Sequence, residues 1–286
     1  MYYLIILISV VIFGGCFSLN DKYRQLRGSG IASSMENNFI GAIAGLIVLF
    51  IIEGFGFEAT GFTLAVSFAA ALCGVLLGFV TFKALDSINL SIYSLFSMLG
   101  GMALPFFQGI VFYGEKITLA KILCFVLVCV ALAVTVSNDK KKGKKIYYFA
   151  VFVLNGLFGV MSKIFASSSL KKTSAGWYSI WVAFFTAVLS VLVWLLSPDR
   201  KGAPKISTKA IAVSTSNGIL NRVANFLLVI ALANVDASVQ YPLVTGGVII
   251  VSTVICFFGN KKPSKTELIS VALSFIAMLL LFAIPI

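Results

Sequence analysis

The sequence predicts an all-α polytopic membrane protein with ten transmembrane helices, arranged as an inverted repeat of five plus five. Three observations predict this class. The 286 residues are 60% hydrophobic and only 11% charged, whereas a soluble domain carries about a quarter charged residues. Apolar windows of about 20 residues, long enough to cross the hydrocarbon core of a bilayer, follow one another along the whole chain. Segments of the first half also recur in the second half.

Ten apolar windows lie between polar breaks, and each is long enough for one transmembrane helix. The most polar break is "NDKKKGKK", near the middle of the chain. It divides the chain into a first five-helix repeat at 1–137, a basic linker loop at 138–145 and a second five-helix repeat at 146–286. The ten windows are 2–20, 33–53, 63–84, 88–112, 118–137, 146–167, 177–197, 207–233, 237–258 and 265–285.

The two halves resemble each other at a nearly constant spacing in three pairs of segments. These pairs are 2–15 with 147–160 at a shift of 145 residues, 64–85 with 211–232 at a shift of 147, and 112–118 with 257–263 at a shift of 145. Because each copy holds an odd number of spans, the second copy is inverted in the membrane relative to the first.

The distribution of basic residues predicts the orientation. Sixteen of the 22 lysines and arginines lie in the loops after odd-numbered spans, five lie on the other side, and Arg222 is the remaining one. Basic residues mark cytoplasmic loops. We therefore expect an integral protein of a bacterial cytoplasmic (inner) membrane, with both termini extracytoplasmic.

Short motifs recur in both halves. The first half reads Ala84-Leu85, Pro105 and "GEKIT" at 114–118, and the second reads Ala231-Leu232, Pro242 and Gly259-Asn260. Together with the five-plus-five spans, this pattern resembles the drug/metabolite transporter superfamily, in its ten-helix, EamA-like branch. The resemblance covers essentially the whole chain. It implies a basket of helices around a central cavity, with the fifth and tenth spans outside it, and movement of small organic solutes by alternating access.

The second copy departs from this pattern because Asn260 stands where the first copy has Glu115. We interpret the "GEKIT" region as loop architecture and not as part of the solute site. Two other charged residues receive local interpretations. Glu36 closes a predicted capping box, "SSME", at the start of the second span. Lys163 lies about one turn from the end of the sixth span, from where its ammonium could reach the interface.

Arg222 is the main candidate for function because it stands at the midpoint of the eighth span. It is the only charged residue between Lys209 and Asp236, and an arginine at this depth costs about 2.5–3.5 kcal/mol on insertion scales. Asn217, Asn221 and Asn225 recur every four residues beside it and so share one face of the helix. This polar stripe must face the protein interior or a water-filled cavity.

Two roles for Arg222 remain open at this point. It binds a carboxylate, a phosphate or another anionic group of a solute through paired hydrogen bonds, or it is satisfied by backbone carbonyls and the neighbouring asparagines as an internal support. Tyr93, Gln240 and Tyr241 are further candidates for contact with a solute, and so is Asn155. For each of these, the alternative is packing or hydrogen bonding between helices.

The sequence therefore predicts a secondary transporter for a small polar solute, anionic or zwitterionic, with Arg222 and the asparagines at a mid-membrane site. The alternative within transport is an exporter of cationic or amphipathic drugs or quaternary amines. A membrane enzyme is disfavoured because the chain has no histidine and no clustered carboxylates, and a receptor or assembly subunit is a further rival. We expect no catalytic residue, cofactor or metal. The expected partners are a small-molecule solute and the lipid bilayer, not nucleic acid, and a monomer is plausible.

Overall fold

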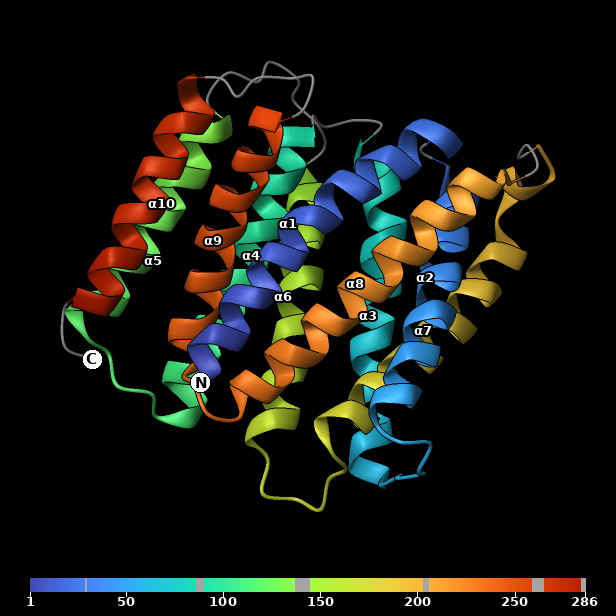
Figure 1. The fold of residues 1–286 in the computed structure, drawn as a ribbon, viewed down its shortest axis with the longest axis horizontal. Helices are drawn as coiled ribbons and strands as arrows, with labels where there is room; N and C mark the ends of the chain where they lie inside the picture. The colour runs from blue at the N-terminus through green and yellow to red at the C-terminus, as the bar shows by residue number, and fades with distance from the viewer. Residues whose placement is uncertain (29, 86–89, 137–144, 203–205, 259–264, 284–286) are drawn as a thin grey trace.

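The chain folds into a bundle of long, tilted α-helices (Figure 1). This computed structural model describes residues 1–286 apart from 29, 86–89, 137–144, 203–205, 259–264 and 284–286. Its elements are α1 (Tyr2–Arg27), α2 (Ile31–Ile52), α3 (Gly61–Leu85), α4 (Leu90–Tyr113), α5 (Leu119–Val136), α6 (Lys145–Ser167), α7 (Ala175–Leu196), the 3-10 helix η1 (Pro198–Gly202), α8 (Thr208–Leu232), α9 (Ala237–Phe258) and α10 (Lys265–Ala283).

The prediction of a polytopic helical membrane protein is confirmed. Among the described residues, eight helices are long and apolar enough to cross a membrane: α1 to α4 and α6 to α9. The described apolar stretches of α5 and α10 are shorter, at Leu119–Val134 and Leu268–Leu281. These two helices pack side by side at one edge of the bundle, where α10 also contacts α9 (Figure 1).

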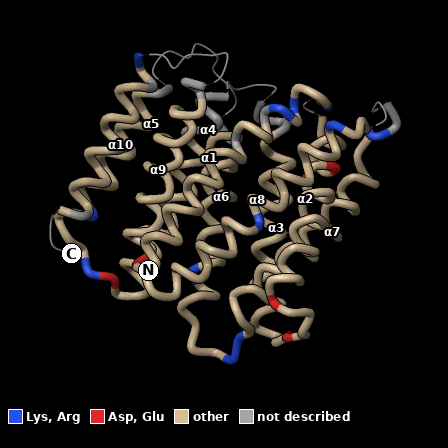
Figure 2. The backbone as a smooth tube through the Cα atoms, viewed as in Figure 1, with Lys and Arg blue, Asp and Glu red and all other residues tan. Residues whose placement is uncertain are grey.

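Successive helices run in opposite directions, so the connecting segments gather at two ends of the bundle (Figure 1). We call the end where α1 begins and α10 ends, with the connections 53–60, 114–118, 168–174 and 233–236, the even-loop face. The opposite end, where α1 and α7 end and α2 and α8 begin, is the odd-loop face. Figure 2 shows the charged residues concentrated toward these two ends, as expected for helices with an apolar middle.

Glycines allow several helices to approach closely. In α2, Gly41 and Gly45 are four residues apart, and a Cβ built on Gly218 of α8 would lie 2.1 Å from the Cα of Gly41. A Cβ on Gly100 of α4 would lie 2.0 Å from the carbonyl oxygen of Phe152 in α6. Small residues at this spacing let helix backbones touch in lipid, so these glycines fix where α8 crosses α2 and where α6 crosses α4.

The predicted capping box at the start of α2 is wrong. The helix begins at Ile31, two residues before Ser33, and its N-cap, Gly30, has no side chain to cap it. The Asp199 carboxylate accepts a hydrogen bond from the Ala32 amide instead, at 3.2 Å. Glu36 forms an ion pair with Arg27 at the end of α1. The start of α2 is therefore capped by Asp199 from η1, and Glu36 pairs with Arg27 of α1 and not with the helix end.

Candidate functional site

A cavity of about 380 Å³ lies at the centre of the bundle. All eight long helices contribute to its wall, whereas no described residue of α5 or α10 does. The lining residues are Phe13, Asn38, Gly74, Leu77, Met98, Gly101, Asn155, Phe158, Gly159, Ser162, Thr186, Asn221, Arg222, Asn225, Leu228, Val229, Leu232, Gln240, Tyr241, Val244, Thr245 and Val248. The wall is therefore mostly apolar with a few convergent polar groups, which is the usual character of a small-molecule site.

Arg222 is the charged group of this wall. Gly45 of α2 makes room for its aliphatic stem, since a Cβ at Gly45 would lie 2.4 Å from the Cγ of Arg222. Within the described part of the chain, the guanidinium has no hydrogen-bond or ion-pair partner, and no acidic residue is among those that line the cavity. The protein therefore leaves a cation with several N–H donors facing a cavity at the centre of the bundle.

Asn221 and Asn225 lie beside Arg222, and both line the cavity. The Asn225 Nδ2 atom donates to the backbone oxygen of Asn221 at 2.8 Å and to its Oδ1 atom at 3.1 Å. The stripe predicted along α8 is therefore present at these two positions. The third asparagine, Asn217, is not among the lining residues. Its Oδ1 atom is buried without a described partner.

The other candidates line the cavity but bridge helices as well. Asn155 donates to the Ser97 carbonyl at 2.5 Å, and Tyr241 donates to the Gly159 carbonyl at 3.0 Å. Gln240 donates through Nε2 to the Leu228 carbonyl at 3.0 Å, which leaves its Oε1 atom buried without a described partner. The side chain of Tyr93 lies outside the described residues. Asn155, Gln240 and Tyr241 therefore line the cavity and also bond neighbouring helices, and their contact with a solute stays a prediction.

Four polar lining residues are not among the predicted candidates: Asn38, Ser162, Thr186 and Thr245. A signal existed for two of them, and Thr245 follows Tyr241 by four residues on one face of α9. Ser162 follows Asn155 by seven residues, so both lie on one face of α6, with Gly159 between them. Asn38 directly follows the polar segment "SSMEN" at the start of α2, and Thr186 stands alone in the apolar sequence of α7. Only the packing of those helices identifies the two residues as part of the wall.

The "GE" motif builds a second polar cluster at the even-loop face. Gly114 ends α4 with a φ of 64°, in the left-handed region that glycine adopts without strain. The amide of Glu115 then donates back to the Gly109 carbonyl near the end of α4 at 3.1 Å, so the chain folds over the helix end. The absence of a side chain at Gly109 leaves room for the Glu115 carboxylate, since a Cβ there would lie 2.5 Å from the carboxyl group.

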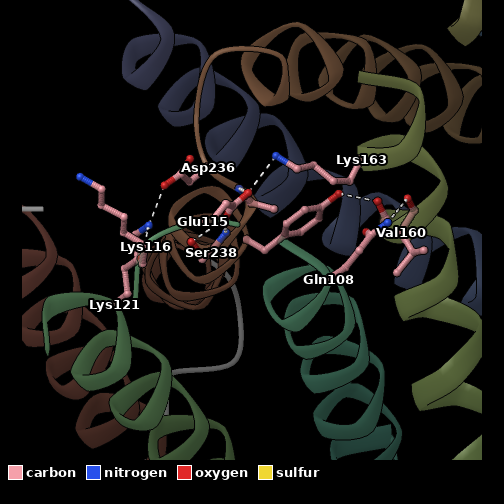
Figure 3. Close-up of polar contacts among 11 residues, drawn as sticks. Gln108, Glu115, Lys116, Lys121, Val160, Lys163, Asp236 and Ser238 are labelled. Carbon is pink, nitrogen blue, oxygen red and sulfur yellow. Dashed lines mark hydrogen bonds and ion pairs between the residues drawn. The ribbon is translucent and has the colours of Figure 1, made fainter. Parts of the chain in front are cut away.

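The carboxylate of Glu115 reaches the start of α9 (Figure 3). It accepts hydrogen bonds from the amides of Ala237 and Ser238 at 2.8 and 2.9 Å and from the Ser238 hydroxyl at 2.5 Å. Its Oε1 atom also lies 2.8 Å from the Nζ atom of Lys163 in α6. Burial raises the pKa of this carboxyl, but Lys163 and the other donors outweigh it, so the pKa of Glu115 lies below its ordinary value.

This geometry corrects the interpretation of Lys163. The residue was expected to extend its ammonium to the interface, but it is buried and paired with Glu115. A second pair lies on the same face, where the Nζ atom of Lys121 is 2.6 Å from the Oδ2 atom of Asp236 in the turn between α8 and α9 (Figure 3). The sequence could not pair these residues, because 48 and 115 positions separate the partners.

The two ends of the cavity differ in exposure. Toward the even-loop face, Ser162 is 7% exposed, Leu232 2% and Gln240 1%. Nearer the odd-loop face, Asn38 and Leu77 are half-buried. The described residues thus close the cavity more completely at its even-loop end, which lies next to the Glu115 cluster.

Gly74 offers a direct test of whether this cavity holds a ligand. A Cβ built there meets only the Phe158 ring at 4.0 Å, so the position faces open space. We expect Gly74→Val to fill part of the cavity and to lower ligand affinity at least about tenfold, because a bound group would lose its volume. Thermal stability should change little. Gly15→Val, at a position with no atom within 4 Å and outside the cavity wall, is the matched control. Equal affinity of both variants in calorimetric titration would contradict a ligand at Gly74.

Comparisons with known proteins identify the fold but not a family. No family model matches the chain, and no curated protein matches it. A solved structure, named only as the crystal structure of a protein, superposes with a TM-score of 0.73 and 17% identity over 98% of both chains. The architecture is therefore an established one, and at this identity the likeness concerns the fold alone.

Proposed function

We propose that the protein is a secondary transporter that moves a small anionic or zwitterionic organic solute by alternating access. The observation that carries the proposal is the Arg222 guanidinium, which faces a mid-membrane cavity and has no protein counter-charge among the described residues. An arginine held in the membrane at such a cost marks a functional site by default. A solute carboxylate or phosphate would supply the missing charge through paired hydrogen bonds.

The lining favours this solute over the cationic drugs of the alternative. A cation in the cavity would meet Arg222 and, among the described lining residues, no carboxylate. The amide oxygens of Asn221 and Gln240 can accept hydrogen bonds from an ammonium or hydroxyl group at the other end of a zwitterion. The apolar remainder of the wall, with Phe13 and Phe158, suits a small hydrocarbon body.

An inverted repeat of five plus five spans is part of the proposal, and the helix contacts support it. Exchanging each helix with the one five places along converts α1–α8 into α6–α3, α1–α9 into α6–α4, and α2–α8 into α7–α3. All six of these pairs pack against each other, and α2–α7, α4–α9 and α5–α10 convert into themselves. A pseudo-two-fold axis through the cavity accounts for this pattern. With α5 and α10 outside, the arrangement agrees with the EamA-like resemblance.

The orientation follows from charge. We assign the odd-loop face to the cytoplasm of a bacterial inner membrane and the even-loop face, with both termini, to the outside. Sixteen basic residues belong to the odd side and five to the even side. We assign the chain no catalytic step and no cofactor, and a monomer contains the whole site.

Ligand-induced stabilisation followed by flux tests this function. Purified protein is heated with single probes: small mono- and dicarboxylates, phosphate esters, zwitterionic amino acids, choline and tetraethylammonium. We expect some anionic or zwitterionic probes to stabilise the folded protein, by about 2.7 kcal/mol at 100 times their Kd, and so to raise its melting temperature. The same probes should exchange across proteoliposomes in radiolabelled counterflow. Stabilisation by the quaternary amines alone would support the exporter. Binding without counterflow would support a receptor.

A further inference from the structure

The ends of α6 and α9 meet directly beneath the cavity at the even-loop face. Ser162 and Gln240 line the cavity, and Lys163 and Ser238 lie one and two residues further toward this face. Each helix packs mainly against other neighbours, α6 against α3 and α4, and α9 against α1, α4 and α10, so α4 is the neighbour that they share. Side chains bridge the two: Tyr241 bonds the Gly159 carbonyl, and Glu115 bonds both Lys163 and the first turn of α9 (Figure 3).

Glu115 is built into this position by its own loop. The left-handed Gly114 turns the chain, and Gly109 leaves room for the carboxylate to fold back. The side chains of Glu115 and Lys163 are only 4% and 7% exposed. Loss of one partner of a buried ion pair strongly destabilises the folded protein, because the other charge remains buried without compensation. The bridge therefore resists separation of α6 from α9.

The opposite face has no such pair at the corresponding positions. At the repeat shift of 145 residues, Glu115 corresponds to Asn260 and Lys163 to Ser18, which are both neutral. The interaction can therefore stabilise closure of one face and not the other. This agrees with the burial of Leu232 and Gln240 at the even-loop end of the cavity and the partial exposure of Asn38 toward the odd-loop end.

We propose that Glu115 is the lock of the even-loop face: its bridge from Lys163 to the N-terminus of α9 must break for the cavity to open on that side. The inference rests on the proposed alternating access and adds a resting state to it. Without solute, the protein rests with the even-loop face locked and the cavity accessible from the odd-loop face. A bound solute must supply the interactions that replace the lock when the protein changes face.

Amide hydrogen exchange of the full chain in lipid nanodiscs, read by mass spectrometry, tests the lock without any solute. The variants are Glu115→Gln and Lys163→Met. The second leaves the hydrogen bonds of Glu115 to α9 in place and removes only the bridge to α6. We expect both variants to exchange about tenfold faster at 160–168 and 236–242, and more slowly than wild type at 20–27 and 31–38, as the population shifts toward the opposite opening.

Asp236→Asn is the matched control. It removes the same charge on the same face, but its pair with Lys121 joins α5 to the α8–α9 turn and does not bridge α6 and α9. Its exchange should remain at wild-type values at 160–168. The proposal would be overturned if the two variants exchanged faster at the even-loop face but no more slowly at the odd-loop face. Loss of a helix cap alone would give that result, because it loosens only the nearby helix ends. Unchanged exchange in Lys163→Met would overturn it as well. Since no solute is present, neither result depends on whether counterflow succeeds.

Discussion

Replacing Arg222 with methionine is expected to abolish binding of the anionic or zwitterionic solute while leaving the protein folded and at least as stable as the wild type. Methionine keeps an unbranched stem that can pack on Gly45 and removes the guanidinium. Hydrogen bonds to charged groups contribute about 1.5–3 kcal/mol each, so the loss of two should lower affinity at least about 100-fold. Calorimetric titration with the probe that most stabilises the wild type measures this change.

The direction of the stability change separates the two roles of Arg222. If the side chain supported the structure, its removal would leave carbonyls or amides without donors and lower the melting temperature. The described contacts give it no such partner, and its presence at mid-membrane depth opposes insertion. We therefore expect Arg222→Met to melt at or above the wild-type temperature. A lower melting temperature with unchanged affinity would contradict a ligand-binding role.

Two further variants sharpen the comparison. Arg222→Lys keeps the charge but loses the planar fork, so affinity should fall to an intermediate value if the solute is held by paired hydrogen bonds. Arg200→Met removes the same charge from η1 at the odd-loop face, where the guanidinium lies over the Trp194 ring, and should bind as the wild type does. Equal binding by Arg222→Lys and wild type would indicate a point charge without a directional contact.

Features carried by local sequence were predictable. Each of the ten apolar windows overlaps one helix, because helix formation in lipid depends on a run of apolar residues with satisfied backbone groups. The stripe on α8 predicted which face turns inward, and Arg222, Asn221 and Asn225 do line the cavity. Asn155, Gln240 and Tyr241 do so as well. Asn217, one turn nearer the start of α8 than Asn221, is not among the lining residues.

Features that depend on distant partners were not predictable. Lys163 and Glu115 each have a local explanation, at a helix end and in a loop, and only folding brings them within 2.8 Å of each other. Glu36 likewise fits a local capping pattern, and only the packing of α1 against α2 places Arg27 beside it. One missed feature did have a signal in the sequence. "GAIAG" at 41–45 is a GxxxG pattern, which is typical of close helix contacts in membranes.

The GxxxG face of α2 leads to the largest expected effect on stability. A Cβ at Gly218 would lie 2.1 Å from the Cα and 2.5 Å from the carbonyl oxygen of Gly41. Both atoms belong to backbone, which cannot move aside as a flexible side chain does. We expect Gly218→Val to destabilise the protein by at least about 3 kcal/mol, the upper end for overpacking. This would lower the apparent melting temperature by roughly 10 °C.

The same contact also positions the site. Gly218 precedes Arg222 by four residues, and Gly41 precedes Gly45 by four, so the glycine contact and the arginine stem lie one turn apart on the same pair of helices. Forcing α8 away from α2 should therefore weaken ligand binding together with stability, whereas Arg222→Met weakens binding alone. Gly15→Val in α1, with open space around it, controls for the substitution itself. Wild-type melting of Gly218→Val in detergent would contradict backbone contact between α2 and α8.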